Sequence, residues 1–326
     1  MIRTRSTLLA VGDPRHGVTA AALAQAEAHD VVLRGGIELL DADLGSGPVH
    51  VHVTDRLFGD GPEDAADRLV ALARRVPLLV TLHDLPQPSD GERNFPRRRL
   101  AYSRVADAAR HVVVSSRHER GLLTTSSPVT VVPLPVPTLR PDRATAPVDP
   151  GARPTAVAVL GYLYPGKGHV PTLAAMSGLP ADVGLVALGR TSPGHEDLAE
   201  ALAARAAELG RRFTVTGYLE DDVLLGRLRS PVIPVAAHEH LSASGSIGTW
   251  VAAGRRPIVP PSPWAEEFEE RNPGSLLLTS DLRGALAEAF ADPARTFADP
   301  GRRGAPDLAE TVLAVRDLLR RIEVRG

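Results

Sequence analysis

Residues 156–168 read AVAVLGYLYPGKG, a short apolar run followed at once by a loop with glycine at three positions. A β-branched run that ends in such a loop, with a helical pattern after it, is typical of the first strand–loop–helix unit of an α/β domain. Glycines let the backbone approach a ligand closely, and a lysine held between Gly166 and Gly168 can reach a diphosphate as a compact point charge. The stretch therefore predicts an α/β fold and an anion site, although an ordinary turn with an exposed lysine fits the same short pattern.

The same alternation extends along most of the chain. Short apolar runs predict strands over Thr7–Val11, Val49–Val53, Leu78–Leu82, His111–Ser115, Val129–Val132, Ala156–Leu160, Val183–Leu188, Phe213–Thr216, Val232–Val235 and Pro257–Val259. Stretches of helical period predict helices over Val18–Ala28, Glu63–Arg75, Pro96–Arg110, Glu196–Leu209 and Asp222–Leu228. Alternating strands and helices indicate parallel sheets, so the sequence predicts an α/β protein with two Rossmann-like domains that face each other across a cleft.

A proline-rich segment separates the two halves. Residues 133–154 contain seven prolines and no apolar period, so they continue neither a helix nor a central strand. We expect an N-terminal domain over 1–137, a linker over 138–154 and a second domain over 155–304. Residues 305–326 are expected to form a helix that packs back on the N-terminal domain through one apolar stripe. The stripe consists of Leu308, Val312, Val315, Leu319 and Ile322.

The composition excludes several classes of protein. The chain has 326 residues, a formal net charge of -2 and no cysteine, which excludes disulfides, thiol nucleophiles and zinc–thiolate sites. The charge balance argues against a nucleic-acid partner or a polybasic membrane anchor, and no apolar run approaches the roughly 18 residues of a membrane span. We therefore expect a cytoplasmic protein with small-molecule partners. Of the 37 basic residues only Lys167 is a lysine, which singles out this position.

A second polar segment, HEHLSASGSIGT, precedes a predicted helix in the second half. Ser242, Ser244 and Ser246 place hydroxyl groups beside the free backbone N–H groups of a helix start, an arrangement that binds phosphate. A plain helix N-cap, which needs one serine, is the alternative. His238 and His240 invite a metal-site interpretation, but without a cysteine or a third ligand in register a solvated loop explains them better. We expect no metal ion here.

Polar residues in the first half also follow predicted strands. His83 ends one strand, where its imidazole can hydrogen-bond a sugar hydroxyl, although a lone histidine at a strand end is more often structural. Residues 12–17 precede the first predicted helix, and on their own they are interpreted as an ordinary loop rather than a ligand site. His50 and His52 share one face of a strand and are interpreted as structural. The D-x-D pair at 41–43 lies in a predicted loop and is interpreted as a chance match.

The order of these motifs resembles that of retaining glycosyltransferases with two Rossmann-like domains (the GT-B type), in particular family 4. The similarity covers nearly the whole chain. Four features of the family's first domain have counterparts here. The glycine of the first loop corresponds to Gly17, and the strand that ends in histidine corresponds to Leu82–Asp84. The strand that ends in Val-x-Ser corresponds to Val114–Ser116, and the Val-Pro pair that leads into the linker corresponds to Val132–Pro133. The second domain of the family opens with a motif like Gly-Arg-Leu-x-Pro-x-Lys-Gly, which residues 161–168 match. The segments 186–189, 214–219 and 252–259 then follow in family order.

The glutamates of the family motif are missing. Counting back from Gly254, the two glutamates of the family's Glu-x7-Glu motif fall on Leu241 and Thr249, so the usual carboxylates on the sugar and ribose sides are absent. Glu239 or His240 is the candidate replacement for part of their role, and the alternative is that the acceptor and donor are held differently. The loop arginine is missing too, since a tyrosine stands at its position, 162.

The resemblance implies a metal-independent retaining glycosyltransferase without a cofactor. It would move a hexose, with mannose from GDP-mannose as the leading choice, to a hydroxyl of a sugar or glycan acceptor in polysaccharide synthesis. His83, which would position the sugar, and Lys167 are assigned as catalytic. The residues assigned to donor binding are Gly17, Gly161, Tyr162, Lys167, Gly189, Tyr218, Leu219, Glu239, His240, Ser242, Ser244, Gly245, Ser246 and Thr249. A nucleotide-sugar epimerase on the same fold and a nucleotide-sugar-binding protein with a decayed site are the alternatives.

Overall fold

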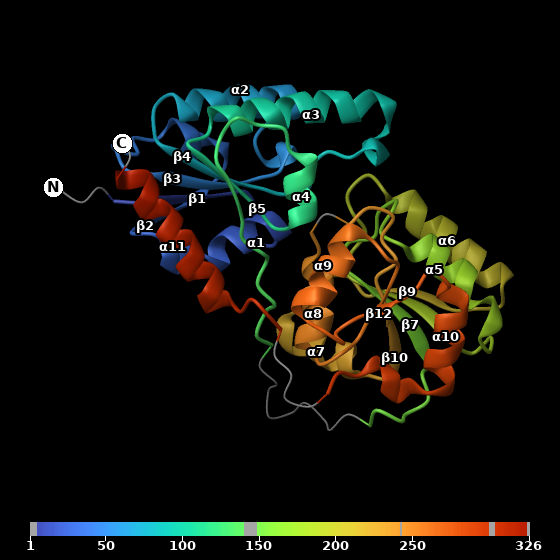
Figure 1. Ribbon diagram of the computed structural model, residues 1–326. Coiled ribbons are helices and arrows are strands. Elements are labelled where there is room, and N and C mark those ends of the chain that lie inside the picture. The colour runs from blue at the N-terminus through green and yellow to red at the C-terminus, as the bar shows by residue number, and fades with distance from the viewer. Residues whose placement is uncertain (1–4, 140–148, 242, 300–303, 325–326) are drawn as a thin grey trace. The chain divides into compact units, whose positions relative to one another are not determined.

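The structure, a computed structural model, describes residues 5–139, 149–241, 243–299 and 304–324. The chain divides into two compact units, one of Met1–Pro135 with Pro306–Gly326 and one of Val136–Ala305. Each unit is built around a six-stranded sheet (Figure 1), and the strand pairs in both sheets are parallel. The α/β class with two Rossmann-like domains that the sequence predicts is confirmed. Residues 140–148, within the predicted linker, lie outside the described residues.

The first sheet has the strand order β2-β1-β3-β4-β5-β6. Its strands are β1 (Thr7–Val11), β2 (Val31–Gly35), β3 (Val49–Val53), β4 (Leu78–Leu82), β5 (His111–Val114) and β6 (Val129–Val131). The helices of this unit are α1 (Gly17–Ala24), α2 (Pro62–Ala73), α3 (Gly91–Ala108), α4 (Arg117–Leu122) and α11 (Leu308–Val324). Short 3₁₀ turns are η1 (Ala26–Ala28), η2 (Ile37–Asp41), η3 (Asp55–Leu57) and η4 (Pro88–Asp90).

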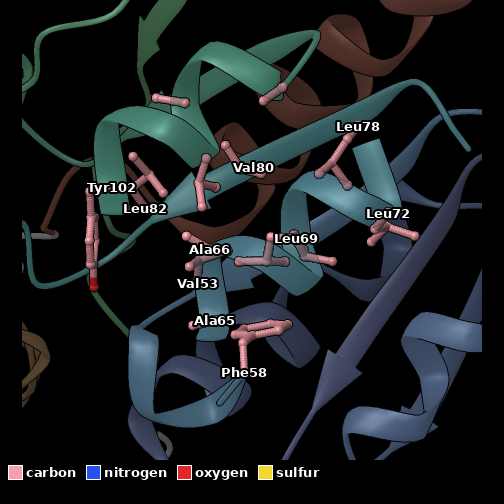
Figure 2. Close-up of a cluster of buried hydrophobic side chains, with 14 of the residues drawn as sticks. Val53, Phe58, Ala65, Ala66, Leu69, Leu72, Leu78, Val80, Leu82 and Tyr102 are labelled. Carbon is pink, nitrogen blue, oxygen red and sulfur yellow. The ribbon is translucent and has the colours of Figure 1, made fainter. Parts of the chain in front are cut away.

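Strand β3, with the sequence VHVHV, separates two different layers of this unit. Because side chains alternate across a strand, its valines face one side of the sheet and its histidines the other. The valines join the main hydrophobic cluster with Leu69 of α2 and Tyr102 of α3, and with Phe58, which follows η3 (Figure 2). His50 and His52 are buried on the opposite face. A fully buried strand therefore carries two polar side chains, which must find partners within the protein.

The C-terminal helix α11 packs on this opposite face. Val312, Val315, Leu319 and Ile322 are buried against Leu79 and other sheet residues in a separate cluster. Leu308, the first residue of the predicted apolar stripe, is instead 38% exposed, so that part of the expected stripe is wrong. It stands at the first residue of the helix, before the buried stripe begins at Val312.

The second sheet has the order β12-β11-β10-β7-β8-β9. Its strands are β7 (Ala156–Leu160), β8 (Gly184–Leu188), β9 (Phe213–Val215), β10 (Val232–Val235), β11 (Ile258–Val259) and β12 (Leu277–Leu278). The helices are α5 (His169–Ala175), α6 (Glu196–Glu208), α7 (Asp221–Arg229), α8 (Gly245–Ala252), α9 (Pro263–Arg271) and α10 (Leu282–Ala291), with 3₁₀ turns η5 (Met176–Gly178) and η6 (Pro293–Thr296). The chain leaves β7 on one side to β8 and returns on the other side with β10. Open parallel sheets bind ligands at the carboxyl ends of their strands, at such a reversal point.

Several elements of the structure differ from the sequence prediction. The sequence does not predict strands β2 and β12. Strand β2 is an edge strand that is only partly buried, and β12 has two residues, so neither gives a strong apolar run. Helix α3 begins at Gly91 and not at Pro96, which lies inside it. Proline is favoured in the first turn, so the sequence pattern placed the helix start too late. The predicted helix over 18–28 ends at Ala24 and is followed by a 3₁₀ turn.

Candidate functional site

The glycine loop after β7 packs closely against the neighbouring loops of the second unit. Gly161, Gly166 and Gly168 have φ angles of 113°, 85° and 97°, a backbone region that favours glycine. A Cβ atom at Gly168 would lie 2.3 Å from the carbonyl oxygen of Ala237, and one at Gly189 would lie 2.2 Å from that of Gly161. The glycines therefore let the loops after β7, β8 and β10 meet at the carboxyl edge of the sheet.

Lys167 is buried in this loop. Its side chain is 8% exposed, and its Nζ donates a hydrogen bond of 3.1 Å to the Oγ atom of Ser246. Among the described residues it forms no ion pair. Burial lowers the pKa of Lys167 from 10.5 to about 8. An ammonium group without a carboxylate partner in a shielded position is energetically unfavourable unless an anion binds beside it.

The serines of the second motif lie against this ammonium group. Ser244 caps helix α8, because its Oγ atom accepts a hydrogen bond from the backbone N–H of Ile247. The Oγ atoms of Ser244 and Ser246 are 3.1 Å apart. The structure thus joins the two sequence motifs into one group of donors at the start of a helix, next to Gly245, the first residue of α8. Ser242 lies outside the described residues.

Two buried histidines lie near Lys167. Burial, and secondarily Lys167, lowers the pKa of His169 to about 3, and neither of its buried ring nitrogens has a hydrogen-bond partner within the described part of the chain. Burial, then the charges of Lys167 and His169, lowers the pKa of His238 well below 6.5. Neither histidine was assigned to the site from the sequence. His169 could have been noticed, because it follows Lys167 by two residues.

Tyr162, at the position of the missing family arginine, is joined to an arginine from the next loop. The guanidinium group of Arg190 donates a 2.7 Å hydrogen bond to the phenol oxygen of Tyr162 and lies 5.1 Å from the centre of its ring. Arg190 follows Gly189 directly after β8, at the same edge of the sheet as the glycine loop. The structure therefore places a positive charge beside the position where the sequence predicted a loss of charge.

The other residues assigned to donor binding occupy neighbouring loops. The backbone N–H of Gly189 donates to the hydroxyl of Thr216, just before Tyr218 and Leu219, of which the tyrosine is 50% exposed. Leu219 is partly buried against a hydrophobic cluster. These two residues follow β9, at the outer end of the sheet.

Glu239 and His240 are the candidate replacements for the missing glutamates, and Thr249 stands at one of the positions where a glutamate is missing. The backbone N–H of Glu239 donates to the carbonyl oxygen of Gly166 at 2.9 Å, so Glu239 and His240 lie at the glycine loop. Both residues are exposed. The hydroxyl of Thr249 donates back to the carbonyl oxygen of Gly245 within helix α8. The structure thus places the carboxylate of Glu239 beside Gly166 of the glycine loop.

The residues assigned in the first unit lie around the start of α1 and the end of β4. Gly17 is the first residue of α1, and no atom lies within 4 Å of the position where its Cβ would be. His83 is buried at the end of β4, with its backbone N–H donating to the carbonyl oxygen of Val53. Gly17 and His83 belong to the first unit, whereas the other assigned residues belong to the second.

Comparisons with solved structures identify the fold. No protein-family model and no curated protein matches the chain. Anabaena Alr3699/HepE in complex with UDP and glucose matches with a TM-score of 0.69 and 15% identity, covering 99% of this chain and 98% of that one. Sucrose-phosphate synthase from Thermosynechococcus elongatus matches with a TM-score of 0.61 and 17% identity, covering 96% and 78%. The chain has the GT-B fold. An alpha-glucosyltransferase in complex with UDP-glucose and DNA containing an abasic site matches with 0.60 and 11%, covering 98% and 94%.

In the C-terminal half of this GT-B chain, Lys167 and Ser246 lie together at the carboxyl edge of the sheet. Lys167 follows β7 and Ser246 follows β10, so the hydrogen bond between them bridges the reversal point of the second sheet. Within the described residues, no group of three or more His, Asp or Glu side chains could hold a metal ion. No helix among the described residues of either unit is both long and apolar enough to cross a membrane.

A row of histidines runs through the N-terminal half of the GT-B fold. The ring centroids of His29 and His50 are 5.2 Å apart, those of His50 and His52 are 4.7 Å apart, and those of His52 and His83 are 5.1 Å apart. Burial lowers the pKa of His29 and of His83 to about 4, and lowers the pKa of His50 and of His52 well below 6.5. All four side chains are therefore neutral at pH 7.

This row is expected to make the first unit sensitive to acid. Because the folded-state pKa values lie below the value of 6.5 in the unfolded chain, the unfolded state binds more protons as the pH falls from 6.5 toward 4. Stability is thus complete above pH 6.5 and is lost below it, by about 2 kcal/mol at pH 5 for a histidine shifted as His83 is. Urea unfolding at about pH 7.5 and pH 5 measures this loss. His50→Leu should reduce the difference, and equal stabilities at the two pH values would contradict the prediction.

Proposed function

We propose that this chain is a glycosyltransferase that moves a hexose from a nucleotide diphosphate sugar to a hydroxyl of a sugar or glycan acceptor. The observation that carries the proposal is the buried ammonium group of Lys167, which has one hydrogen bond, to Ser246, and no ion pair among the described residues. The GT-B fold supports it, because solved structures that share this fold bind UDP and UDP-glucose.

Lys167, Ser246 and the start of helix α8 suit the leaving group of such a transfer. When the bond between the sugar C1 and the diphosphate oxygen breaks, negative charge develops on that oxygen, and a fixed positive charge beside it stabilises the transition state. Lys167 supplies the charge, the hydroxyl of Ser246 donates a hydrogen bond, and the free N–H groups at the start of α8 add a favourable dipole. A bound diphosphate would also raise the pKa of the ammonium group above 8.

We propose a retaining, metal-independent reaction. The bond from the sugar C1 to the acceptor oxygen forms on the same face from which the diphosphate departs. The proton of the acceptor hydroxyl passes to the departing diphosphate oxygen, so the products are a glycoside and a nucleoside diphosphate. No protein nucleophile is required, and the assigned role of His83 is to hold the transferred sugar rather than to act as a base. Metal independence rests on the charge that Lys167 provides where other transferases use a divalent cation.

The donor sugar is the finer part of the proposal. The sequence resemblance favours GDP-mannose, whereas the neighbouring solved structures include Anabaena HepE in complex with UDP-glucose, over 98–99% of both chains. We expect UDP-glucose to be the better donor, since the fold similarity extends over the whole chain while the sequence motifs that imply mannose lack their glutamates.

The proposed function is tested with a panel of nucleotide sugars and sugar acceptors, in which release of free nucleoside diphosphate and formation of a glycoside are measured together. Both products are expected, and an unchanged rate in EDTA is expected as well. An isomeric nucleotide sugar without free diphosphate would indicate an epimerase. Saturable binding of the donor without either product would indicate a binding protein with a decayed site. Faster transfer from GDP-mannose would overturn the choice of donor alone.

A further inference from the structure

His52 lies directly behind His83 in the first unit. The Nδ1 atom of His52 and the Nε2 atom of His83 are 3.0 Å apart, and the two rings are stacked at an angle of 27°. The side chains are 2% and 6% exposed. A hydrogen bond joins them, so one ring must donate and the other must accept. This inference rests on the proposed function, in which His83 contacts the transferred sugar.

The other histidines of the row do not reach this pair. The Nδ1 atom of His29 donates to the carbonyl oxygen of Gln25, so its Nε2 atom accepts from Nδ1 of His50, and Nε2 of His50 accepts from the hydroxyl of Thr81. The rings of His50 and His52 are tilted by 47°, and no hydrogen bond connects them. The row is therefore two separate networks rather than a continuous path for protons.

The direction of the hydrogen bond between His52 and His83 follows from the surroundings of the other ring nitrogen of His52, Nε2. The Nε2 atom of His52 is buried and has no hydrogen-bond partner within the described residues. If it carried the proton, a buried N–H donor would be left unpaired, which costs about 1–3 kcal/mol and is rarer in proteins than an unpaired acceptor. The proton of His52 therefore lies on Nδ1 and is donated to Nε2 of His83. The remaining proton of neutral His83 must then lie on Nδ1.

The backbone holds the ring of His83 in this arrangement. Its N–H donates to the carbonyl oxygen of Val53 at 2.8 Å, and its own carbonyl oxygen accepts from the hydroxyl of Tyr102 at 3.2 Å. Asp84, the next residue, has a φ of 54° and is held by two hydrogen bonds from Arg98. The Nδ1 atom of His83 makes no hydrogen bond within the described part of the chain. It is the ring atom left to bind a ligand.

We propose that His52 is a positioning residue, which fixes the tautomer of His83 so that its Nδ1–H is presented as a donor to a hydroxyl of the transferred sugar. A neutral histidine can otherwise carry its proton on either nitrogen, and the tautomer is set by the hydrogen bond that the other nitrogen makes. Both rings are neutral at pH 7, because burial lowers the pKa of each. The choice between tautomers therefore matters in the working enzyme.

The experiment compares two amide substitutions at position 52. His52→Asn keeps an N–H group near the Nδ1 position of the original ring, whereas His52→Gln places its amide near the Nε2 position, away from His83. His50→Gln is the matched control, since His50 lies on the same face of the same strand and its partners are His29 and Thr81. The 326-residue chain, labelled with 15N-histidine, is studied by long-range 1H–15N correlation spectra at about pH 7, with His83→Ala to assign the resonances.

The wild type, His52→Asn and His50→Gln are expected to show His83 protonated at Nδ1. His52→Gln should lose this preference, and its kcat should fall by about 10- to 100-fold with a much smaller change in the KM for the donor. An unchanged tautomer of His83 in folded His52→Gln would overturn the role of His52, even where transfer by the wild type is intact. If the wild type shows no transfer, the proposed function fails, while the spectra still decide the tautomer. Should His52→Gln not fold, His52→Leu takes its place with the same expected results.

Discussion

Lys167→Ala is expected to lower kcat for sugar transfer by roughly a hundred- to a thousandfold, or about 2–4 kcal/mol of transition-state stabilisation. The ammonium group is buried and hydrogen-bonded to Ser246, so its interaction with the diphosphate strengthens as the sugar bond breaks and charge develops. The KM for the donor should therefore rise much less than kcat falls. Steady-state kinetics at saturating acceptor separates the two effects. Lys167→Arg should restore part of the rate, since a planar guanidinium group cannot occupy the position of a compact ammonium group.

A second variant separates the catalytic role of this lysine from its effect on folding. Because burial lowers the pKa of Lys167 from 10.5 to about 8, the charged form destabilises the free protein at neutral pH. Lys167→Met removes the charge and keeps an apolar side chain of similar length, so it should be more stable than the wild type, by on the order of 3 kcal/mol at pH 7. The difference should shrink as the pH rises from about 8 to 10.5.

Activity and stability of the Lys167 variants, measured together, distinguish a catalytic role of this residue from a structural one. A Lys167→Met variant that is more stable than the wild type but inactive would show that Lys167 acts in the reaction, since the protein loses stability when a purely structural residue is replaced. Near-normal transfer by folded Lys167→Ala would remove the observation on which the proposed function rests. A loss of stability in Lys167→Met would instead indicate that the ammonium group has a stabilising partner in the free protein.

Much of the fold could be predicted from the sequence, because its central strands are short buried runs between helical stretches. The run at 156–160 and the run at 49–53 were predicted with the bounds that the structure shows. Edge strands carry less information, since they are partly exposed and need no apolar run, which explains why β2 and β12 were missed. The start of α3 was missed because proline, usually a first-turn residue, lies within that helix.

The candidate site could be predicted only where neighbours in the sequence are neighbours in space. The glycine loop and the serine turn were found as separate motifs, but the hydrogen bond from Lys167 to Ser246 joins residues 79 positions apart. The burial of the lysine follows from that packing, and no local pattern shows it. The pairing of Arg190 with Tyr162 depends in the same way on the parallel pairing of β7 and β8.

The histidine row illustrates the same limit in the first unit. The alternation in β3 shows that His50 and His52 share a face, which the structure bears out. The contact between His52 and His83 depends on the register of β3 against β4, in which Val53 pairs with Leu82. A shift of this register by one residue would turn one of the two histidines to the other face of the sheet. The sequence alone does not determine the register of β3 against β4.

Gly168→Ala is expected to destabilise the second unit by about 3–5 kcal/mol and to abolish donor binding. The φ of Gly168 is 97°, a conformation that strains any side chain, and the added Cβ would lie 2.3 Å from the carbonyl oxygen of Ala237. Backbone atoms cannot move aside as a flexible side chain does, so the loops after β7 and β10 must separate. That separation would also pull Lys167 away from Ser246. Urea unfolding and isothermal titration with the nucleoside diphosphate measure the two losses.

The control is Gly194→Ala, which carries a similar backbone strain without the collision. The φ of Gly194 is 81°, and no atom lies within 4 Å of its added Cβ. This variant should lose only about 1–2 kcal/mol, the part that a positive φ costs, and should bind the diphosphate as the wild type does. The difference between the two variants therefore isolates the close approach of the two loops from the conformational preference of glycine. Equal losses in both would mean that the loops after β7 and β10 are not held in contact, and the site would not be preformed at the edge of the sheet.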